Sequence, residues 1–236
     1  MNRIKQTAEK ILGRPLEASE GVDIQSIEVA EKKLNVKFPQ ALKDFYLNVG
    51  KLALFTDAFE FFAKPKQIYI KSNKLVFLEE NQAVLSWGID LNDLGKEVVP
   101  VYHSPNIGDQ ESEVIWYTEA LPLPDFLELI MFYQAASADA DLQTRSKGGY
   151  PLSYVGYKSD LENAELWDKF QKDLSEKWEK VVDGNGLVIY WCKYGLLLYY
   201  SVQDLDTDVD DLIYLSTRKD FDLSDFKSKF GFQQLD

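Results

Sequence analysis

The sequence predicts an α+β protein in which N-terminal helices pack on a mainly antiparallel sheet, followed by a C-terminal helix–hairpin–strand–helix extension. Three observations predict this class. Apolar side chains recur at helical spacing in residues 1–50, short alternating apolar segments fill residues 68–117, and another helical pattern follows at residues 125–136. The predicted strands lie too close together in the sequence for crossover helices, which favours antiparallel pairing.

Three helices are predicted in residues 1–50. Gly13–Pro15 ends the first helix, and Asp23 is a competent N-cap for the second. Pro39 suits the first turn of the third helix, and Gly50 fits a left-handed position after its C-terminus. We expect the apolar and aromatic side chains of these helices to form a core.

Five short segments rich in β-branched or aromatic residues, each bounded by Asn, Asp, Gly or Pro, predict the strands of the sheet. They are residues 68–70, 75–78, 83–89, 98–102 and 114–117. Trp87 and Trp116 fall inside two of these patterns, and a tryptophan in such a position is more often a core residue than an exposed anchor. The helix at residues 125–136 would then cover the sheet.

The predicted domain organisation is a core over residues 1–138, a linker or long loop over residues 139–158, and a C-terminal α+β subdomain over residues 159–236. Residues 139–158 lose hydrophobic periodicity and gain Gly, Ser and charge, which is typical of a connection. The subdomain is either separate from the core or continuous with its sheet. Its predicted elements are a helix, a hairpin, a strand and a closing helix at residues 161–181, 187–202, 212–215 and 223–230.

The chain of 236 residues is acidic, with 39 Asp and Glu against 26 Lys and Arg and a formal net charge of −13. Residues 1–100 carry 14 acidic and 14 basic side chains, so the whole excess lies in residues 101–236. Such a field repels nucleic acids and anionic membranes and attracts basic proteins, so we expect neither a nucleic-acid nor a membrane partner. A simpler alternative is that the acidity only maintains solubility. Because no apolar run is long enough for a membrane span or a signal peptide, a cytoplasmic location is expected.

The sequence offers little for catalysis or for a cofactor. Its single histidine, His103, and single cysteine, Cys192, cannot form a His/Cys zinc site or an internal disulfide. Phosphate-binding and nucleophile-elbow glycine motifs do not occur, and the adjacency of His103 and Ser104 says nothing about facing geometry. We therefore predict a non-catalytic protein without a metal or cofactor.

An acidic run near the C-terminus resembles a calcium motif; its members are Asp204, Asp206, Asp208, Asp210 and Asp211. The spacing does not fit an EF-hand loop, because counting from the first or the second aspartate puts the wrong residues where glycine and glutamate are needed. We interpret the run as a solvated acidic loop. A phosphate-mimicking contact with a basic partner is the second interpretation, and a metal site is the third.

Several stretches together resemble the SUKH superfamily. IEVAEKKLNVKFPQALKDFYLNVG is similar to its opening helices, in which an acidic helix leads into a Phe-Pro turn and a helix that ends at glycine. KLVFLEENQAVLSWGI is similar to its strand pair with an EENQ connection, and VVPVYH and VIWYTEALPLPDFLELIMFYQA are similar to its later strands and helix. The resemblance implies a SUKH-like α+β fold. It also implies an immunity protein that neutralises a cognate toxin, such as a basic nuclease or deaminase; the alternative is a regulatory or scaffold protein like the fungal cell-wall regulators.

For such a binding role, the candidate contact residues are Glu79, Glu80, Gln82 and Trp116, together with the five aspartates of the acidic run. The polar connection that contains the two glutamates has a structural interpretation, because such loops need side chains that bond nearby backbone. In the functional interpretation, this polar connection forms part of the rim of the surface that contacts the partner. Trp116 would be an anchor of the interface if its ring were exposed.

Overall fold

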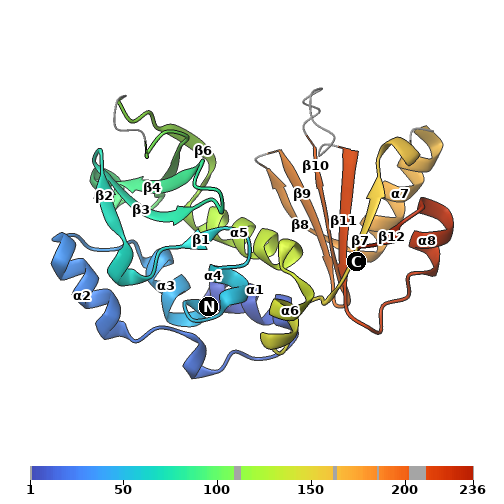
Figure 1. Ribbon diagram of the computed structural model, residues 1–236, viewed down its shortest axis with the longest axis horizontal. Helices are drawn as coiled ribbons and strands as arrows, with labels where there is room; N and C mark the ends of the chain where they lie inside the picture. Colours follow the sequence, from blue (N-terminus) through green and yellow to red (C-terminus); the bar gives the residue numbers. More distant parts are fainter. Residues whose placement is uncertain (1, 109–112, 162–163, 185, 202–210, 236) are drawn as a thin grey trace. The chain divides into compact units, whose positions relative to one another are not determined.

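In this computed structural model the chain forms two compact units, residues 1–134 and residues 135–236 (Figure 1). The structure describes residues 2–108, 113–161, 164–184, 186–201 and 211–235. The division between the units falls in the last turn of helix α5 (Leu123–Ser137).

The first unit begins with helices and continues into a sheet in which paired strands are antiparallel. Its helices are α1 (Arg3–Leu12), α2 (Ile24–Leu34), α3 (Gln40–Val49), α4 (Ala53–Thr56) and α5, with 3₁₀ turns η1 (Ala18–Glu20), η2 (Pro65–Gln67) and η3 (Leu91–Asp93). Its strands are β1 (Phe61–Phe62), β2 (Tyr69–Lys71), β3 (Lys74–Glu79), β4 (Ser86–Asp90), β5 (Pro100–Ser104) and β6 (Tyr117–Pro122). The strand order is β1-β3-β4-β5-β6, and β2 pairs with the first half of β3.

Helix α1 forms where the spacing of apolar residues predicts it. Ile4, Ala8 and Ile11 recur on one face and are buried, and Gly13 ends the helix in the left-handed conformation with φ 69°. Asn2 caps the other end, because its side chain accepts a hydrogen bond from the backbone of the first turn.

Gly50 does not adopt the left-handed conformation that the sequence predicts, since its φ is −64°. The position needs glycine because of close packing. A Cβ added there would lie 2.6 Å from the backbone oxygen of Tyr46 and 2.9 Å from the side chain of Val22. The position of Pro39 also differs slightly from the prediction. Pro39 is the N-cap of α3, and the helix itself starts one residue later, at Gln40.

Helices cover one face of the first sheet (Figure 1). Phe45 of α3 stacks on Phe62 of β1 with ring centroids 4.2 Å apart, and Phe126 of α5 packs edge-on against Phe77 of β3. Trp87 of β4 is 7% exposed and lies in this core. Two strands start later than predicted, because β4 begins at residue 86 and β6 at residue 117.

The second unit contains another antiparallel sheet, with strand order β12-β7-β11-β10-β9-β8. Its elements are α6 (Ala140–Arg145), β7 (Leu152–Tyr157), η4 (Ser159–Leu161), α7 (Ala164–Lys177), β8 (Glu179–Gly184), β9 (Leu187–Cys192), β10 (Gly195–Tyr200), β11 (Leu212–Thr217), α8 (Ser224–Phe230) and β12 (Gln233–Gln234). The antiparallel sheets and helices of the two units confirm the predicted α+β class.

Two expectations for this part of the chain are corrected. Residues 139–158 are not a linker, because they contain α6 and β7, and β7 pairs with both β11 and β12. The helix expected to reach residue 181 ends at Lys177, and the chain continues as strand β8.

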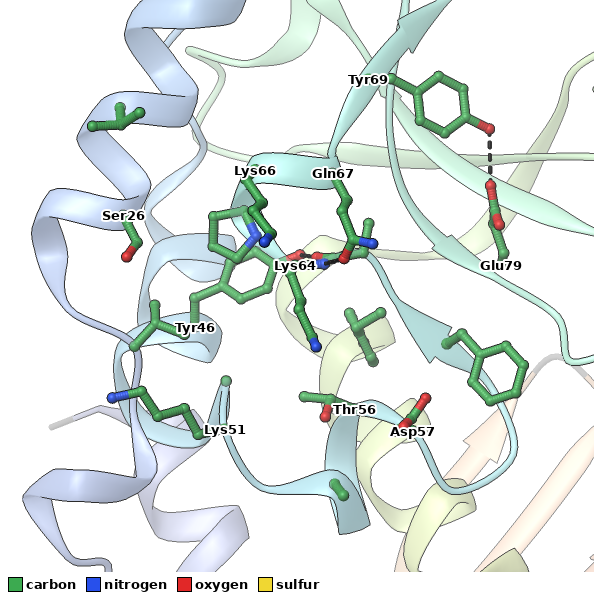
Figure 2. A pocket seen from close by; sticks show the side chains of 18 of the residues that line it. Ser26, Tyr46, Lys51, Thr56, Asp57, Lys64, Lys66, Gln67, Tyr69 and Glu79 are labelled. Atoms are coloured by element: carbon green, nitrogen blue, oxygen red, sulfur yellow. Dashed lines mark hydrogen bonds between the residues drawn. The ribbon is translucent and has the colours of Figure 1, made fainter.

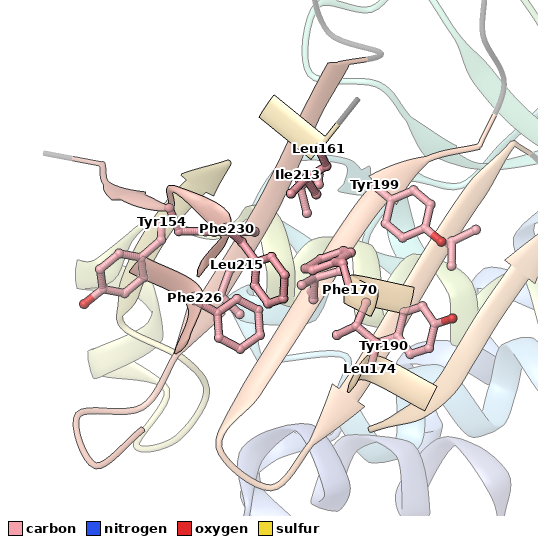
Figure 3. Close-up of a cluster of buried hydrophobic side chains, with 13 residues drawn as sticks. Tyr154, Leu161, Phe170, Leu174, Tyr190, Tyr199, Ile213, Leu215, Phe226 and Phe230 are labelled. Atoms are coloured by element: carbon pink, nitrogen blue, oxygen red, sulfur yellow. The ribbon is translucent and has the colours of Figure 1, made fainter. Parts of the chain in front are cut away.

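An aromatic cluster fills the space between the second sheet and helices α7 and α8 (Figure 3). Phe170 of α7 is fully buried and packs edge-on against Phe230 of α8, with ring centroids 5.0 Å apart. Gly156 of β7 leaves room for this layer, because an added Cβ would lie 2.7 Å from the ring of Phe232. The second unit therefore has a hydrophobic core of its own.

Candidate functional site

A groove opens on the first unit between α2 and the segment formed by α4, β1, η2 and β2 (Figure 2). Its volume is about 1200 Å³, and it is open to solvent. Pockets for small molecules usually enclose roughly 300–1,000 Å³. The dimensions of the groove therefore suit a segment of another protein better than an enclosed small ligand.

Apolar side chains in the walls of the groove are exposed. Val29 of α2 is 64% exposed and Phe61 of β1 is 42% exposed, and both line the groove. Exposed apolar side chains in a concave lining are a feature that interaction surfaces share.

Three lysines, Lys51, Lys64 and Lys66, supply the basic groups of the groove. Figure 2 shows the Lys64 side chain extending into the space between α2 and β1. Among the residues that the structure describes, none of the three forms an ion pair. Asp57 and Glu79 are the carboxylates of the lining, and Glu79 accepts a hydrogen bond from the Tyr69 hydroxyl at 2.9 Å. The groove is therefore cationic, although the chain as a whole is acidic.

Buried Gln134 of α5 holds the segment between α4 and β1 in place. Its Oε1 accepts hydrogen bonds from the backbone N–H groups of Phe59 at 2.7 Å and Glu60 at 2.9 Å, and its Nε2 donates to the Glu60 carbonyl at 2.6 Å. These bonds satisfy backbone groups that would otherwise be buried without partners. They also fix the residues immediately before Phe61, so one wall of the groove is rigidly supported.

The Glu60 side chain is an unusual feature of this wall. It is 5% exposed, and its Oε2 has no hydrogen-bond partner in the described part of the chain. Burial raises the pKa of Glu60 to about 7, and the negative charge of Glu80 adds to the shift. A carboxyl group behind the groove therefore titrates near neutral pH.

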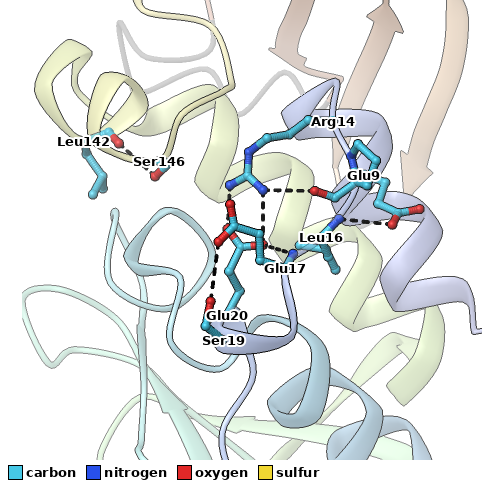
Figure 4. Close-up of polar contacts among 9 residues, drawn as sticks. Glu9, Arg14, Leu16, Glu17, Ser19, Glu20, Leu142 and Ser146 are labelled. Atoms are coloured by element: carbon cyan, nitrogen blue, oxygen red, sulfur yellow. Dashed lines mark hydrogen bonds and ion pairs between the residues drawn. The ribbon is translucent and has the colours of Figure 1, made fainter.

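Backbone contacts also fix the other parts of the groove. The Tyr46 hydroxyl donates to the carbonyl of Ala63 at 2.5 Å, and the backbone N–H of Lys51 donates to the carbonyl of Glu20 at 2.9 Å. Glu20 is in turn held by the Arg14 guanidinium, which donates to both of its carboxylate oxygens at 2.5 and 3.1 Å (Figure 4). The groove thus has a rigid backbone and solvent-facing lysine side chains.

The structure separates the residues predicted to contact a partner. Glu79 lies in the groove, at the end of β3. Glu80 instead closes the following loop, because its Oε2 accepts hydrogen bonds from the backbone N–H groups of Gln82 at 2.8 Å and Val84 at 3.4 Å. Gln82 is exposed in the same loop, and neither it nor Glu80 lines the groove. In this loop Glu80 therefore bonds nearby backbone, as the structural interpretation of the polar connection expects.

Trp116 lies outside the groove and before strand β6, not within a strand as predicted. Its ring is half-buried over Gly88, where an added Cβ would lie 3.2 Å from its Cη2 atom. The Lys74 ammonium is 5.8 Å from the Trp116 ring centroid and 2.7 Å from a carboxylate oxygen of Asp90. Trp116 therefore packs on the sheet and is held beside a paired lysine.

Of the acidic run, Asp204, Asp206, Asp208 and Asp210 lie outside the described residues. The carboxylate of Asp211 accepts hydrogen bonds from the backbone N–H of Ser159 at 2.7 Å and from its hydroxyl at 2.5 Å. Acidic residues are in excess in both units, with 20 against 14 basic residues in residues 1–134 and 19 against 12 in residues 135–236. The negative charge therefore belongs to the whole chain and not to one unit.

His103 lies beside a carboxylate and not beside the neighbouring serine hydroxyl. Its Nδ1 lies 3.0 Å from Oε1 of Glu119, which also accepts a hydrogen bond from Nε1 of Trp87 at 2.8 Å. Ser104 follows His103 on strand β5, and consecutive strand residues point to opposite faces of a sheet. The two side chains therefore do not form a nucleophile and base pair.

Burial raises the pKa of the Cys192 thiol, which disfavours the reactive thiolate. Across the described ranges, there is no group of three or more His, Cys, Asp or Glu side chains that could hold a metal ion. The helices that the structure describes include none that is both long and apolar enough to cross a membrane.

Reasoning from the sequence missed the three lysines of the groove. They are spread over two loops and a 3₁₀ turn, so no spacing rule connects them. A signal was nevertheless present, since residues 24–75 carry nine lysines against five acidic residues. Counting charge over residues 1–100 as one block conceals this basic stretch.

Residues 24–115 match a family model described as SUKH_6, SMI1-KNR4 cell-wall. Comparison with curated proteins and comparison with solved structures gave no match. The family match lies within the first unit, and all the residues that line the groove except Val22 fall inside it. The match covers less than half of the chain and supports a SUKH domain within the first unit. This match supports, in general terms, an immunity-type or SMI1/KNR4-like function by protein–protein interaction.

Proposed function

We propose that this protein is a non-catalytic, cytoplasmic immunity-type protein that binds and neutralises a cognate toxin through the groove of its SUKH domain. The observation that carries the proposal is the location of the groove, which is built almost entirely from residues 24–115, the stretch that matches the family. Its exposed Val29 and Phe61 supply apolar contact area, and its lysines supply positive charge for any carboxylates in the bound part of the toxin. Binding over the working surface of a toxin is sufficient to block it.

The net charge of −13 supports the part of this proposal in which an acidic surface meets a basic toxin. A nuclease or deaminase that holds nucleic-acid phosphates is usually basic where it binds them. The long-range negative field of this chain would draw such a partner in and raise the association rate. The groove would then make the short-range contacts.

The proposal is tested by co-expressing the chain with the toxin encoded beside its gene. Rescue of growth and co-elution of the two proteins on a sizing column are the expected results. Val29→Glu should abolish rescue, whereas Val98→Glu should not, because Val29 lines the groove and Val98, which is 65% exposed, does not. Failure of the unmodified chain to rescue growth or to form a complex would overturn the proposal.

The positive charge of the groove favours a second candidate, a regulatory or scaffold protein that binds an acidic endogenous partner. Lys51, Lys64 and Lys66 are poorly placed to contact a uniformly basic toxin. Gene neighbourhood distinguishes the two candidates, because a toxin gene next to this one favours immunity and an isolated gene favours regulation. A pull-down from native cells identifies the partner directly.

A further inference from the structure

We infer that the groove of the first unit binds a short segment of the partner protein that carries both carboxylates and large apolar side chains. This inference rests on the proposed function as a binding protein and adds the chemistry of the segment that is bound. It holds for either candidate partner, because it concerns the bound segment and not the net charge of the partner.

Charge complementarity is the first reason. Lys51, Lys64 and Lys66 line the groove, and within the described ranges none of them has an ion-pair partner. The Lys33 ammonium adds a fourth positive charge at the η2 end, where it donates to the Lys66 carbonyl at 3.5 Å. Three unpaired ammonium groups in one concave surface attract carboxylates and repel a basic segment.

The carboxylates of the lining do not cancel this preference. The Tyr69 hydroxyl that donates to Glu79 at 2.9 Å is neutral, so Glu79 keeps its negative charge, but the lining holds only two carboxylates against three lysines. Asp57 is exposed and is not ion-paired in the described structure. The balance within the groove is therefore positive, in a chain whose formal net charge is −13.

Exposed apolar side chains are the second reason. Val29 and Phe61 stand in the two walls, on α2 and β1, and are 64% and 42% exposed. A free anion such as phosphate would leave them uncovered, and so would a nucleic-acid backbone. A peptide segment with leucine or aromatic side chains would cover them while its carboxylates reach the lysines.

The rigid support of the groove is the third reason. Gln134 fixes the backbone before Phe61, and the Glu20 carbonyl fixes the backbone of Lys51. A preformed groove loses little conformational entropy when a segment binds, which raises affinity without additional contacts.

The test is selection of a phage-displayed library of random 12-residue peptides on the immobilised full chain. We expect recovered peptides to be enriched in Asp and Glu together with Phe, Trp, Leu or Ile. A synthetic copy of the strongest peptide should bind Lys64→Glu/Lys66→Glu about tenfold more weakly. The matched control Lys71→Glu/Lys219→Glu changes the net charge equally at exposed lysines outside the groove and should bind normally. Phe61→Ser should also weaken binding.

Enrichment in Lys and Arg, absence of any selected peptide, or equal binding to both double variants would overturn the inference. If a twelve-nucleotide oligothymidylate binds more tightly than the peptide, the lysines bind phosphate groups. That result would overturn the inference as well. Growth rescue separates this inference from the proposed function. If Lys64→Glu/Lys66→Glu still rescues growth, the inference fails and the function stands; if the unmodified chain binds the peptide but does not rescue, the toxin function fails alone.

Discussion

The carboxylate of Glu31 accepts a hydrogen bond from the backbone N–H of Phe38 at 2.8 Å and thereby joins the end of α2 to the start of α3. Glu31 is 3% exposed and also pairs with Lys37 at 2.7 Å and Lys43 at 3.0 Å. Although burial acts to raise the pKa of Glu31, these partners outweigh it and lower the pKa. The glutamate in the VAEKKLNVKFP stretch is therefore a structural residue that sets the angle between the two helices.

Replacing Glu31 with Gln should destabilise the first unit by about 2–3 kcal/mol, because the buried charged hydrogen bonds are lost and two lysines lose their partner. Urea denaturation measures the change in the free energy of unfolding. Glu28→Gln is the control, since Glu28 is exposed on the same helix. A change of less than about 0.5 kcal/mol for Glu31→Gln, the range of ordinary surface substitutions, would contradict the prediction.

Stability should fall as pH rises because of Glu60. Its pKa is raised from 4.5 to about 7 in the folded chain, so the folded state holds the proton more tightly than the unfolded state does. The stabilisation that Glu60 adds to the free energy of unfolding is fully present below pH 4.5. It is lost as pH rises through about 7. The loss is at most roughly 3.5 kcal/mol, since one pKa unit corresponds to about 1.4 kcal/mol.

Glu60→Gln should flatten this part of the pH profile and make the chain more stable than the unmodified one at pH 8. Thermal unfolding at a series of pH values measures the effect. Asp57→Asn, an exposed carboxylate nearby, should leave the profile unchanged. Identical profiles for the unmodified chain and Glu60→Gln would show that the carboxyl group titrates normally.

Gln134→Leu should loosen the wall of the groove. The substitution leaves the backbone N–H groups of Phe59 and Glu60 without their acceptor, which costs about 1–3 kcal/mol for the buried Glu60 donor and less for the partly buried Phe59 donor. Hydrogen exchange at residues 55–62 should accelerate more than exchange at α1. Equal acceleration throughout the first unit would mean that Gln134 acts only on global stability.

Gly156→Ala should destabilise the second unit by about 1–3 kcal/mol, because its Cβ would lie 2.7 Å from the Phe232 ring in a well-packed aromatic layer. Hydrogen exchange of strand β7 reports the change locally. Gly95→Ala is the matched control, since nothing lies within 4 Å of a Cβ at that position. Unchanged protection of β7 would contradict the packing at Gly156.

Association with a basic partner should slow markedly between about 0.05 and 0.5 M salt, because the Debye length falls several-fold over that range. Stopped-flow mixing of the chain with its partner measures the rate. The dissociation rate should change less, since it depends on the short-range contacts. An association rate that does not depend on salt would remove electrostatic steering from the proposed function.

Local patterns in the sequence determined most of the secondary structure. The spacing of Ile4, Ala8 and Ile11 predicts α1, and Gly13 ends it, because these features depend only on neighbours along the chain. The same holds for the hairpin of β9 and β10 and for helix α8. The family resemblance of the first unit could also be read from the sequence.

Tertiary structure alone decided the features that depend on distant residues. Gly50 is required by the side chain of Val22, and β7 is a strand because β11 and β12 pair with it, although its own residues resemble a loop. The groove also depends on distant residues, since Lys51, Lys64 and Val29 line one concave surface although they lie in separate segments of the chain. A linear pattern encodes which residues can form a helix or strand, whereas a concave surface depends on which distant segments share it.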